Sequence, residues 1–397
     1  MKILAVNAGS SSLKFQLVEM PEEKVITSGQ VERIGLPNSI FTIKYQGEKT
    51  QTIQDIPDQP EAVRVVMNGL KEKGIIKNVD DIKGVGHRVV QGGESFSKTE
   101  VVTEEVGKEV LRLAEFAPHH NAAEYAGYMA FKKELPNAIH TMVFDTAFHQ
   151  TIPEERYIYA LPYRYYQDYR VRRYGAHGTS HKYIASVIKE YYGKDEYKLI
   201  SCHLGSGASL CAIENGKSVD TSMGFTPLGG IMMGTRCGDI DPSILSYVMK
   251  KDNLTPDEMN HVCNYDSGLL GVSGISSDMR DIDKAEKENI HQAFLARKVY
   301  CTRVAQFIGS YFVELGGCNA IVFTAGVGEN SISTRKALIP MIKDALGIEV
   351  DENNPVEICN GKGVKISTKN SKVDVFIIPT NEEIMMCRDT YDIIMGK

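Results

Sequence analysis

Short apolar runs alternate along the chain with longer stretches in which apolar residues recur every three to four positions. The short runs predict buried β-strands at residues 138–144, 320–324 and 373–378. The periodic stretches predict helices at residues 104–116, 122–135, 182–192 and 287–315. Strands that alternate with helices in this way indicate an α/β protein.

Capping residues suggest where two of the helices begin. A side-chain oxygen just before a helix can accept a hydrogen bond from one of its first free backbone N–H groups. Thr179 or Ser180 is therefore the expected N-cap of the helix at 182–192, and Thr380 or Asn381 is the expected N-cap of the last helix.

An internal repeat relates the two halves of the chain. Residues 1–14 and 197–210 both read as an apolar strand, one polar residue, a Gly/Ser turn and a returning strand. At an offset of 196 residues, Asn7 aligns with His203. Two unrelated hairpins could look alike, but an offset of nearly half the chain favours a duplication that gives two similar α/β lobes.

Length and composition agree with a globular protein of two lobes. The chain has 397 residues, 42% hydrophobic and 24% charged, and typical domains have about 150 residues. A formal net charge of −6 gives no basic excess for nucleic acid, so we expect small-molecule partners. No apolar run resembles a signal sequence or a membrane span, and the expected location is cytoplasmic. The eight cysteines lack a Cys-x-x-Cys pair and are expected to be reduced packing thiols.

Three glycine-rich turns follow apolar strands, at residues 7–12, 203–207 and 324–330. Such turns expose consecutive backbone N–H groups, which form a concave site for phosphate oxygens. Neither a P-loop nor a Gly-x-Gly-x-x-Gly fingerprint is present. Three turns in one chain, two of them related by the repeat, predict a nucleotide polyphosphate held between two lobes. Lys14 follows the first turn within reach of a phosphate, although a solvated strand lysine is the alternative.

Eight segments of the chain together resemble one enzyme family, the acetate kinases. They are NAGSSSLKF (7–15), GHRVVQGG (86–93), VFDTAFH (143–149), RYGAHGTSH (173–181), HLGSGASL (203–210), MGTRCGDIDP (233–242), FTAGVGEN (323–330) and PTNEE (379–383). The resemblance implies a duplicated RNase H-like fold, as in actin-like ATPases, with an active-site cleft between two lobes. It also implies reversible, Mg2+-dependent transfer of the ATP γ-phosphoryl group to acetate, giving acetyl phosphate and ADP, by a homodimer. Mn2+ is an alternative metal.

The lobes implied by the repeat and by the resemblance are discontinuous in sequence. Residues 1–149 and 384–397 are the expected N-terminal lobe, and residues 150–383 the expected nucleotide-binding C-terminal lobe. Residues 151–174, rich in tyrosine and arginine and weak in periodicity, are the expected crossing between them.

Four residues are the expected catalytic groups. Arg88 and Arg236 lie two residues from glycines and can offer a planar fork to a carboxylate or a phosphoryl group, although surface ion pairs are commoner for arginine. By resemblance, Arg88 would hold the substrate carboxylate and Arg236 the transferring phosphoryl group, to which His177 would donate a hydrogen bond. Asp145 would act as an acid or base, or would orient Mg2+ and its waters. Because a carboxylate is already ionised near pH 7, the reaction needs no strong base.

The resemblance also implies the remaining binding residues. The acyl group of the substrate would contact Val90, His119, His120, Ala176 and Pro227. The nucleotide would contact Ser10, Ser12, Lys14, His203, Leu204, Gly205, Ser206, Gly207, Asp278, Met279, Arg280, Gly326, Val327, Gly328, Glu329 and Asn330. The Mg2+ ligands would be Asn7 and Glu382. His177 and His181 are spaced like zinc ligands, but no His-Glu-x-x-His pattern supports a zinc site.

Three positions depart from the family pattern. Ala176 replaces a usual phenylalanine, His119 a usual leucine and Gln91 a common histidine. A wider, more polar pocket would favour a carboxylate larger or more polar than acetate, such as propionate, butyrate or a hydroxy acid. Alternatively, a neighbouring side chain fills the space and acetate is preferred.

Two other functions are compatible with the phosphate-binding turns. An actin-like or chaperone-like ATPase switch would need these turns but not the arginines and His177. A sugar or amide kinase on the same fold would need a base to deprotonate a hydroxyl group, and Asp145 could supply it.

Overall fold

The computed structural model of the chain describes residues 1–117 and 120–397, and these residues form two compact units. Unit 1 comprises Met1–Gln150 and Asn381–Lys397, and unit 2 comprises Thr151–Thr380. Relative to the expected lobes, the return to unit 1 comes three residues earlier, at 381 instead of 384. The reason is that the last helix starts at Glu382, so its first turn already belongs to unit 1.

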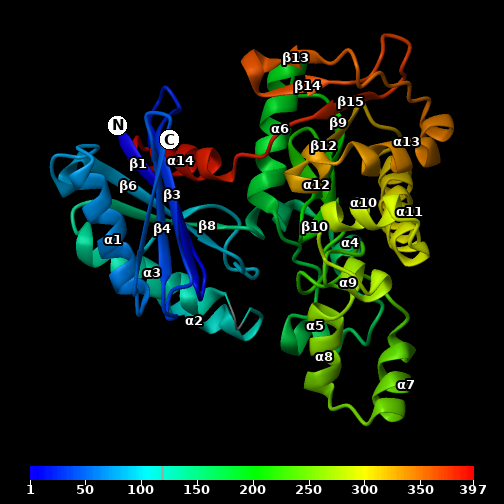
Figure 1. The fold of residues 1–397 in the computed structure, drawn as a ribbon, viewed down its shortest axis with the longest axis horizontal. Helices are drawn as coiled ribbons and strands as arrows, with labels where there is room; N and C mark the ends of the chain where they lie inside the picture. The colour runs from blue at the N-terminus through cyan, green and yellow to red at the C-terminus, as the bar shows by residue number, and fades with distance from the viewer. Residues whose placement is uncertain (118–119) are drawn as a thin grey trace. The chain divides into compact units, whose positions relative to one another are not determined.

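Unit 1 is built on an eight-stranded mixed sheet with the order β5-β4-β3-β2-β1-β6-β8-β7 (Figure 1). Its strands are β1 (Lys2–Ala8), β2 (Ser12–Glu19), β3 (Lys24–Glu32), β4 (Ser39–Tyr45), β5 (Glu48–Gln54), β6 (Ile82–Val89), β7 (Glu100–Val101) and β8 (Ile139–Phe144). Its helices are α1 (Gln59–Glu72), α2 (Glu104–Arg112), α3 (Asn121–Glu134) and α14 (Glu382–Ile394), with short 3-10 turns at Val79–Asp81, Leu113–Glu115 and Ala147–Thr151.

Helices cover both faces of this sheet. Leu4 and Val6 of β1 pack into a core with α1 and α3, whereas Ile3 and Ala5 point to the other face and pack with α14. This alternation follows from the two-residue period of a strand. The red helix α14 therefore lies beside the blue N-terminal strands, although the two segments are at opposite ends of the chain (Figure 1).

Unit 2 is built on a seven-stranded mixed sheet with the order β11-β10-β9-β12-β15-β14-β13. Its strands are β9 (Lys198–Leu204), β10 (Ala208–Glu214), β11 (Lys217–Thr221), β12 (Ala320–Thr324), β13 (Val356–Ile358), β14 (Gly363–Lys365) and β15 (Asp374–Ile377). Its helices are α4 (Glu154–Tyr157), α5 (Arg164–Tyr169), α6 (Gly178–Tyr192), α7 (Pro242–Asp252), α8 (Pro256–Tyr265), α9 (Gly268–Ser273), α10 (Met279–Lys287), α11 (His291–Glu314), α12 (Ala325–Asn330) and α13 (Ile332–Leu346), with a 3-10 turn at Cys359–Gly361.

The two sheets share the same central topology, which confirms the predicted duplication. In unit 1 the strands run β3-β2-β1-β6-β8, and in unit 2 they run β11-β10-β9-β12-β15. In both, the first three strands are antiparallel neighbours and the last three are parallel neighbours. The sequence repeat corresponds to the hairpins β1–β2 and β9–β10.

Several predicted elements need correction. Helix α6 begins at Gly178 after a left-handed His177, not after Thr179 or Ser180. The Ser180 hydroxyl is unavailable for capping because it bonds to residues of other elements. The expected glycine-rich turn at 324–330 is largely the short helix α12.

Two long predicted helices are also interrupted in the structure. The expected helix at 104–116 ends at Arg112 and continues as a 3-10 turn. The expected helix at 287–315 starts only at His291, because Asn289 adopts a left-handed conformation and separates it from α10. The expected N-cap Asn381 is confirmed, since its side chain accepts a hydrogen bond from the Ile384 N–H.

Candidate functional site

An arginine–aspartate pair lies at the ends of two neighbouring parallel strands of unit 1. Arg88 is the penultimate residue of β6 and Asp145 directly follows β8, and the register pairs Arg88 with Val143. The Arg88 Nε atom lies 3.1 Å from Asp145 Oδ2, and Arg88 Nη2 lies 2.5 Å from the same oxygen. Asp145 is completely buried, so this two-pronged ion pair supplies the positive charge that its carboxylate needs.

Two further carboxyl groups, those of Glu382 and Glu124, lie close enough to Arg88 for its charge to lower their pKa values. Burial raises the pKa of Glu382 to about 7, against the opposing effect of Arg88, and the nearby Asp145 charge raises it further. Burial raises the pKa of Glu124 to about 7 as well, although Arg88 and a hydrogen bond from the Val90 N–H favour its charged form. The cluster therefore places three carboxyl groups around one arginine, and burial favours the neutral form of two of them.

The donors in this cluster fit a magnesium ion. Asn7 is the next-to-last residue of β1, and its Oδ1 lies 3.4 Å from Arg88 Nη1. Glu382 is the first residue of α14, a helix that packs against β1, β6 and β8. These are oxygen donors, and Mg2+ is usually held by one or two carboxylates while it keeps several waters. A divalent cation would favour the ionised form of Glu382 and neutralise its charge and that of Asp145.

The loop after β6 is held in place by side chains that the sequence did not indicate. Asn121 of α3 accepts a hydrogen bond from Gln91 N at 3.1 Å and donates to Gln91 O at 2.9 Å. Glu124 accepts from Val90 N at 3.0 Å, and Thr146 accepts from Gly92 N at 2.9 Å. Such buried polar contacts fix the backbone on either side of Val90, a proposed acyl-pocket residue.

The first glycine turn of unit 1 joins β1 to β2. Gly9 N donates to Ser12 O at 2.8 Å, and Gln59 of α1 donates to Gly9 O at 2.5 Å. Ser10 and Lys14 are exposed, and Lys14 lies opposite Asn7 in the strand register. The turn is thus a rigid hairpin end that presents polar side chains.

In unit 2, two side chains from separate segments converge on the turn between β9 and β10. Gly207 ends the turn between β9 and β10, and a β-carbon at this position would lie 3.3 Å from Arg236 Nη1 and 3.6 Å from His177 Nε2. The missing side chain therefore leaves a small space that a guanidinium and an imidazole both reach. Hydrogen-bond donors that meet in this way can surround a phosphoryl group.

Arg236 differs from Arg88 in having no acidic partner among the described residues. Its Nη1 donates to Pro227 O at 3.3 Å and to the Met233 sulfur at 3.8 Å. Burial lowers the pKa of this guanidinium, since its charge loses water without gaining a carboxylate. Binding of an anion beside Gly207 would supply the missing compensation.

A polar layer supports the histidines between α6 and the sheet. The rings of His177 and His203 stack with their centroids 4.1 Å apart. His203 Nδ1 lies 2.8 Å from Ser180 Oγ, which lies 2.7 Å from Thr380 Oγ1. Glu329 Oε1 accepts a hydrogen bond from the Thr380 N–H at 3.1 Å, so Glu329 helps to hold the chain end that leaves unit 2.

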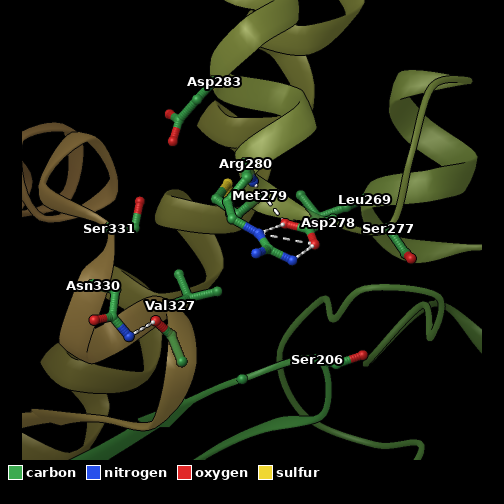
Figure 2. Close-up of a pocket in the computed structure, with 12 residues that line it drawn as sticks. Ser206, Leu269, Ser277, Asp278, Met279, Arg280, Asp283, Val327, Asn330 and Ser331 are labelled. Carbon is green, nitrogen blue, oxygen red and sulfur yellow. Dashed lines mark hydrogen bonds and ion pairs between the residues drawn. The ribbon is translucent and has the colours of Figure 1, made fainter.

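A cavity of about 460 Å³ lies within unit 2 (Figure 2). Of the predicted nucleotide contacts, its walls include Gly205, Ser206, Asp278, Met279, Arg280, Gly326, Val327 and Asn330. The walls also include four residues that the sequence did not indicate, Leu269, Ser277, Asp283 and Ser331. Figure 2 shows Arg280 folded back onto Asp278, with Nη2 2.6 Å from Oδ2, while Asn330 Nδ2 donates to Gly326 O at 2.9 Å.

The other predicted nucleotide contacts lie outside these walls. His203 and Leu204 end β9, and Gly207 ends the adjoining turn. The Glu329 side chain accepts a hydrogen bond from the Thr380 N–H. Gly328 packs against the backbone of Phe323, where a β-carbon would come within 3.3 Å of its carbonyl carbon. Ser10, Ser12 and Lys14 belong to unit 1.

The predicted acyl-pocket residues are distributed over both units. Val90 is buried in unit 1, and His120, which immediately precedes α3, is exposed. In unit 2, Pro227 uses its carbonyl group to accept from Arg236, and Ala176 is 4% exposed within the main hydrophobic core. His119 lies outside the described residues.

Several simpler properties follow from the described residues. The eight cysteines are free thiols, as the sequence predicted. Within residues 1–117 and 120–397, no helix is long and apolar enough to cross a membrane. The same residues contain no group of three or more His, Cys, Asp or Glu side chains arranged around a metal site.

Known proteins resemble this chain over nearly its whole length. The acetate kinase of Macrococcus caseolyticus (strain JCSC5402) is 51% identical over 391 residues, which cover 98% of both proteins. The crystal structure of Porphyromonas gingivalis acetate kinase is 43% identical, covers 99% of both chains and gives a TM-score of 0.93. A propionate kinase from Francisella tularensis subsp. tularensis SCHU S4 is 35% identical, with 98% of this chain and 99% of that chain covered and a TM-score of 0.92. The two-lobed α/β fold with two mixed sheets is thus that of these kinases. The model of the Acetokinase family matches residues 2–388, and the chain belongs to this family.

Proposed function

We propose that this protein is an acetate kinase, a phosphotransferase that transfers the ATP γ-phosphoryl group reversibly to the carboxyl group of acetate. Family membership supports the reaction. The observation that carries it in the structure is the pair of donors at Gly207, where the unpaired guanidinium of Arg236 and the ring of His177 border one small space. The nucleotide would occupy the neighbouring cavity of unit 2.

Residues of unit 1 would bind the substrate carboxylate and Mg2+, and residues of unit 2 would bind the phosphoryl group. Arg88, already held by Asp145, would use its remaining N–H groups to orient the substrate carboxylate. Arg236 and His177 would stabilise the charge that develops on the phosphoryl oxygens, the main requirement of phosphoryl transfer. Asn7 and Glu382 would hold Mg2+, which neutralises phosphate charge when it is bound. Asp145 is bound by Arg88 and would orient Mg2+ and its waters. It would not need to deprotonate the substrate, since acetate is already ionised.

Acetate is the substrate that the packing of unit 2 favours. A larger or more polar carboxylate would need space where Ala176 replaces a phenylalanine, yet Ala176 is 4% exposed and belongs to the hydrophobic core of its unit. One methylene group in an apolar pocket changes binding by about 1 to 3 kcal/mol, so propionate would be a slower substrate rather than an excluded one.

A substrate panel tests this proposal. The purified protein is incubated with ATP, Mg2+ and acetate, propionate, butyrate, lactate or glycolate, and the acyl phosphate is trapped as the hydroxamate. We expect acetate to have the highest kcat/KM. A higher value for another acid would move the preference to that acid. ATP hydrolysis at the same rate with and without carboxylate would instead support an ATPase switch and contradict the kinase assignment.

The family resemblance supports two further proposals. The enzyme would act as a cytoplasmic homodimer on small molecules, without nucleic acid or membrane partners. Light scattering during size-exclusion chromatography tests the dimer, for which the expected mass is twice that of the 44.0 kDa chain.

A further inference from the structure

A chain of three buried polar side chains connects the core of unit 2 to the ring of His177. Ser201 Oγ lies 2.9 Å from His181 Nδ1, and His181 Nε2 lies 2.9 Å from Ser209 Oγ. Ser209 Oγ in turn lies 2.9 Å from His177 Nδ1. Ser201, His181 and Ser209 have no exposed surface.

The local sequence explains why these groups meet. Ser201 and His203 are two positions apart on β9, and Ser209 on β10 pairs with His203. All three side chains therefore lie on one face of the sheet. Ile200 and Cys202 point to the opposite face and join the main hydrophobic core. Helix α6 packs against β9, and its first residues bring the two histidines to the hydroxyl groups.

The direction of the hydrogen bonds in this chain follows from the first hydroxyl group. Across residues 1–117 and 120–397, His181 Nδ1 is the one hydrogen-bond partner that the Ser201 side chain has. A buried hydroxyl proton without an acceptor is costly, so Ser201 donates to His181 Nδ1. The neutral His181 ring then carries its proton on Nε2 and donates it to Ser209 Oγ.

The same reasoning fixes the state of the next ring. Ser209 now accepts from His181, and its own proton has one remaining partner in the described structure, His177 Nδ1. His177 must therefore be unprotonated at Nδ1 and must carry its proton at Nε2, the atom that faces the space beside Gly207. A doubly protonated His177 would leave the buried Ser209 proton without an acceptor.

We propose that Ser201, His181 and Ser209 are positioning residues that hold His177 as a neutral imidazole with its proton on Nε2, ready to donate to the transferring phosphoryl group. The role of His177 rests on the proposed kinase function, whereas its protonation state rests on the hydrogen bonds alone. None of the three positioning residues needs to touch a substrate.

Nitrogen NMR of the histidine-labelled protein tests the protonation state without any reaction. The signals of His177 are assigned by their loss in the His177→Gln variant. We expect the native protein to show a protonated Nε2 and an unprotonated Nδ1. In Ser209→Ala, His177 is expected to populate the other tautomer. The same is expected in Ser201→Ala, although Ser201 reaches His177 only through His181 and Ser209. Ser209→Thr and Ser201→Thr, which keep the hydroxyl, should restore the native pattern.

A matched control removes an equally buried hydroxyl that lies outside the chain. Ser222, whose Oγ accepts from Leu210 N at 2.9 Å, is replaced by alanine, and the His177 signals are expected to remain native. Activity gives the second measurement: Ser209→Ala is expected to lower kcat about tenfold or more with little change in KM for ATP, as for the loss of a transition-state donor.

The outcomes separate this inference from the proposed function. A native His177 with its proton on Nδ1, or signals that are unchanged in both alanine variants, would overturn the inference even in an active kinase. A proton on Nε2 in a protein that forms no acyl phosphate would support the inference and contradict the kinase function.

Discussion

Two arginines of this protein are in opposite electrostatic situations, and the difference bears on what each can do. Arg88 is bound by Asp145 through its Nε and Nη2 atoms, whereas Arg236 contacts a carbonyl oxygen and a sulfur atom but no carboxylate among the described residues. An unpaired guanidinium that has lost water is a strong anion site. The space beside Gly207, which Arg236 and His177 border, is where we propose that such an anion binds.

A side chain that fills the space beside Gly207 should slow the reaction strongly without unfolding the protein. A methyl group in Gly207→Ala would lie 3.3 Å from Arg236 Nη1, so we expect kcat to fall about a hundredfold, as for loss of a preorganised donor. Gly309→Ala is the control, because its added carbon meets nothing within 4 Å. Steady-state kinetics and thermal unfolding of both variants are compared. Native kinetics in Gly207→Ala would contradict the assignment of this space to the phosphoryl group.

A pair of buried histidines in unit 1 should make stability depend on pH. His140 donates through Nε2 to Leu135 O, so its Nδ1 accepts from His87 Nε2 at 3.0 Å. Burial lowers the pKa of His140 from 6.5 to about 4, and burial and His140 lower that of His87 well below 6.5. The unfolded chain therefore binds protons at a higher pH than the folded chain does. Stability is fully present above about pH 6.5 and is lost as the pH falls towards 4, by about 3 kcal/mol for His140 alone.

Urea unfolding at several pH values between 7 and 4.5 measures this loss. His140→Gln keeps an uncharged donor and acceptor and is expected to flatten the dependence. His261→Gln, at an exposed position, is expected to leave it unchanged. An equal slope in the native protein and in His140→Gln would show that the pair does not cause it.

At the scale of single elements, glycines allow α14 to approach the sheet of unit 1. A β-carbon at Gly86 of β6 would lie 2.8 Å from Thr390 Oγ1 and 3.2 Å from Met386 O, both on α14. We expect Gly86→Ala to push the helix away and to lower the free energy of unfolding by about 1 to 3 kcal/mol. Chemical denaturation measures the change. In the double variant with Thr390→Ala, the loss should be smaller than the sum of the two single losses. Additive losses would contradict the steric explanation.

A strand without any buried residue is the hardest element to predict. The strand β5 has no buried residue, and it exists because β4 pairs with it across the turn at Gln46 and Gly47, both with positive φ. The fully apolar strand β12 was predicted at its observed bounds because all five of its residues are buried. The pattern of apolar residues predicts an element where at least one of its sides must avoid water. It does not predict a strand that exists only because a neighbouring strand supplies its hydrogen bonds.

For the whole molecule, the duplication produces two similar sheets, and the chain ends meet in one of them. The helix α14 buries Ile384, Met386 and Cys387 against Ile3 and Ala5 of β1. Unit 1 thus depends on a segment that the chain supplies only after unit 2 is complete.

Removing this segment should destabilise one unit selectively. In a chain that ends at Thr380, we expect faster amide hydrogen exchange in β1, β6 and β8, because their covered face is exposed to water, and native exchange in β9 and β12. Mass spectrometry of the exchanged peptides measures both units. A chain that lacks only Gly396 and Lys397 is the control. Equal protection in β1 of both proteins would mean that α14 does not support unit 1.

The sequence by itself determined the duplication, two of the three glycine turns, the family and the pattern of buried strands, because each is recognised from short segments of neighbouring residues. Tertiary structure alone decided which charged and polar groups are partners. Asp145 reaches Arg88 across 57 positions, and Ser209 reaches His177 across 32. Hydrogen bonds and ion pairs act over a few ångströms in space, so the state of Arg236 and the proton of His177 follow only from the folded arrangement of distant segments.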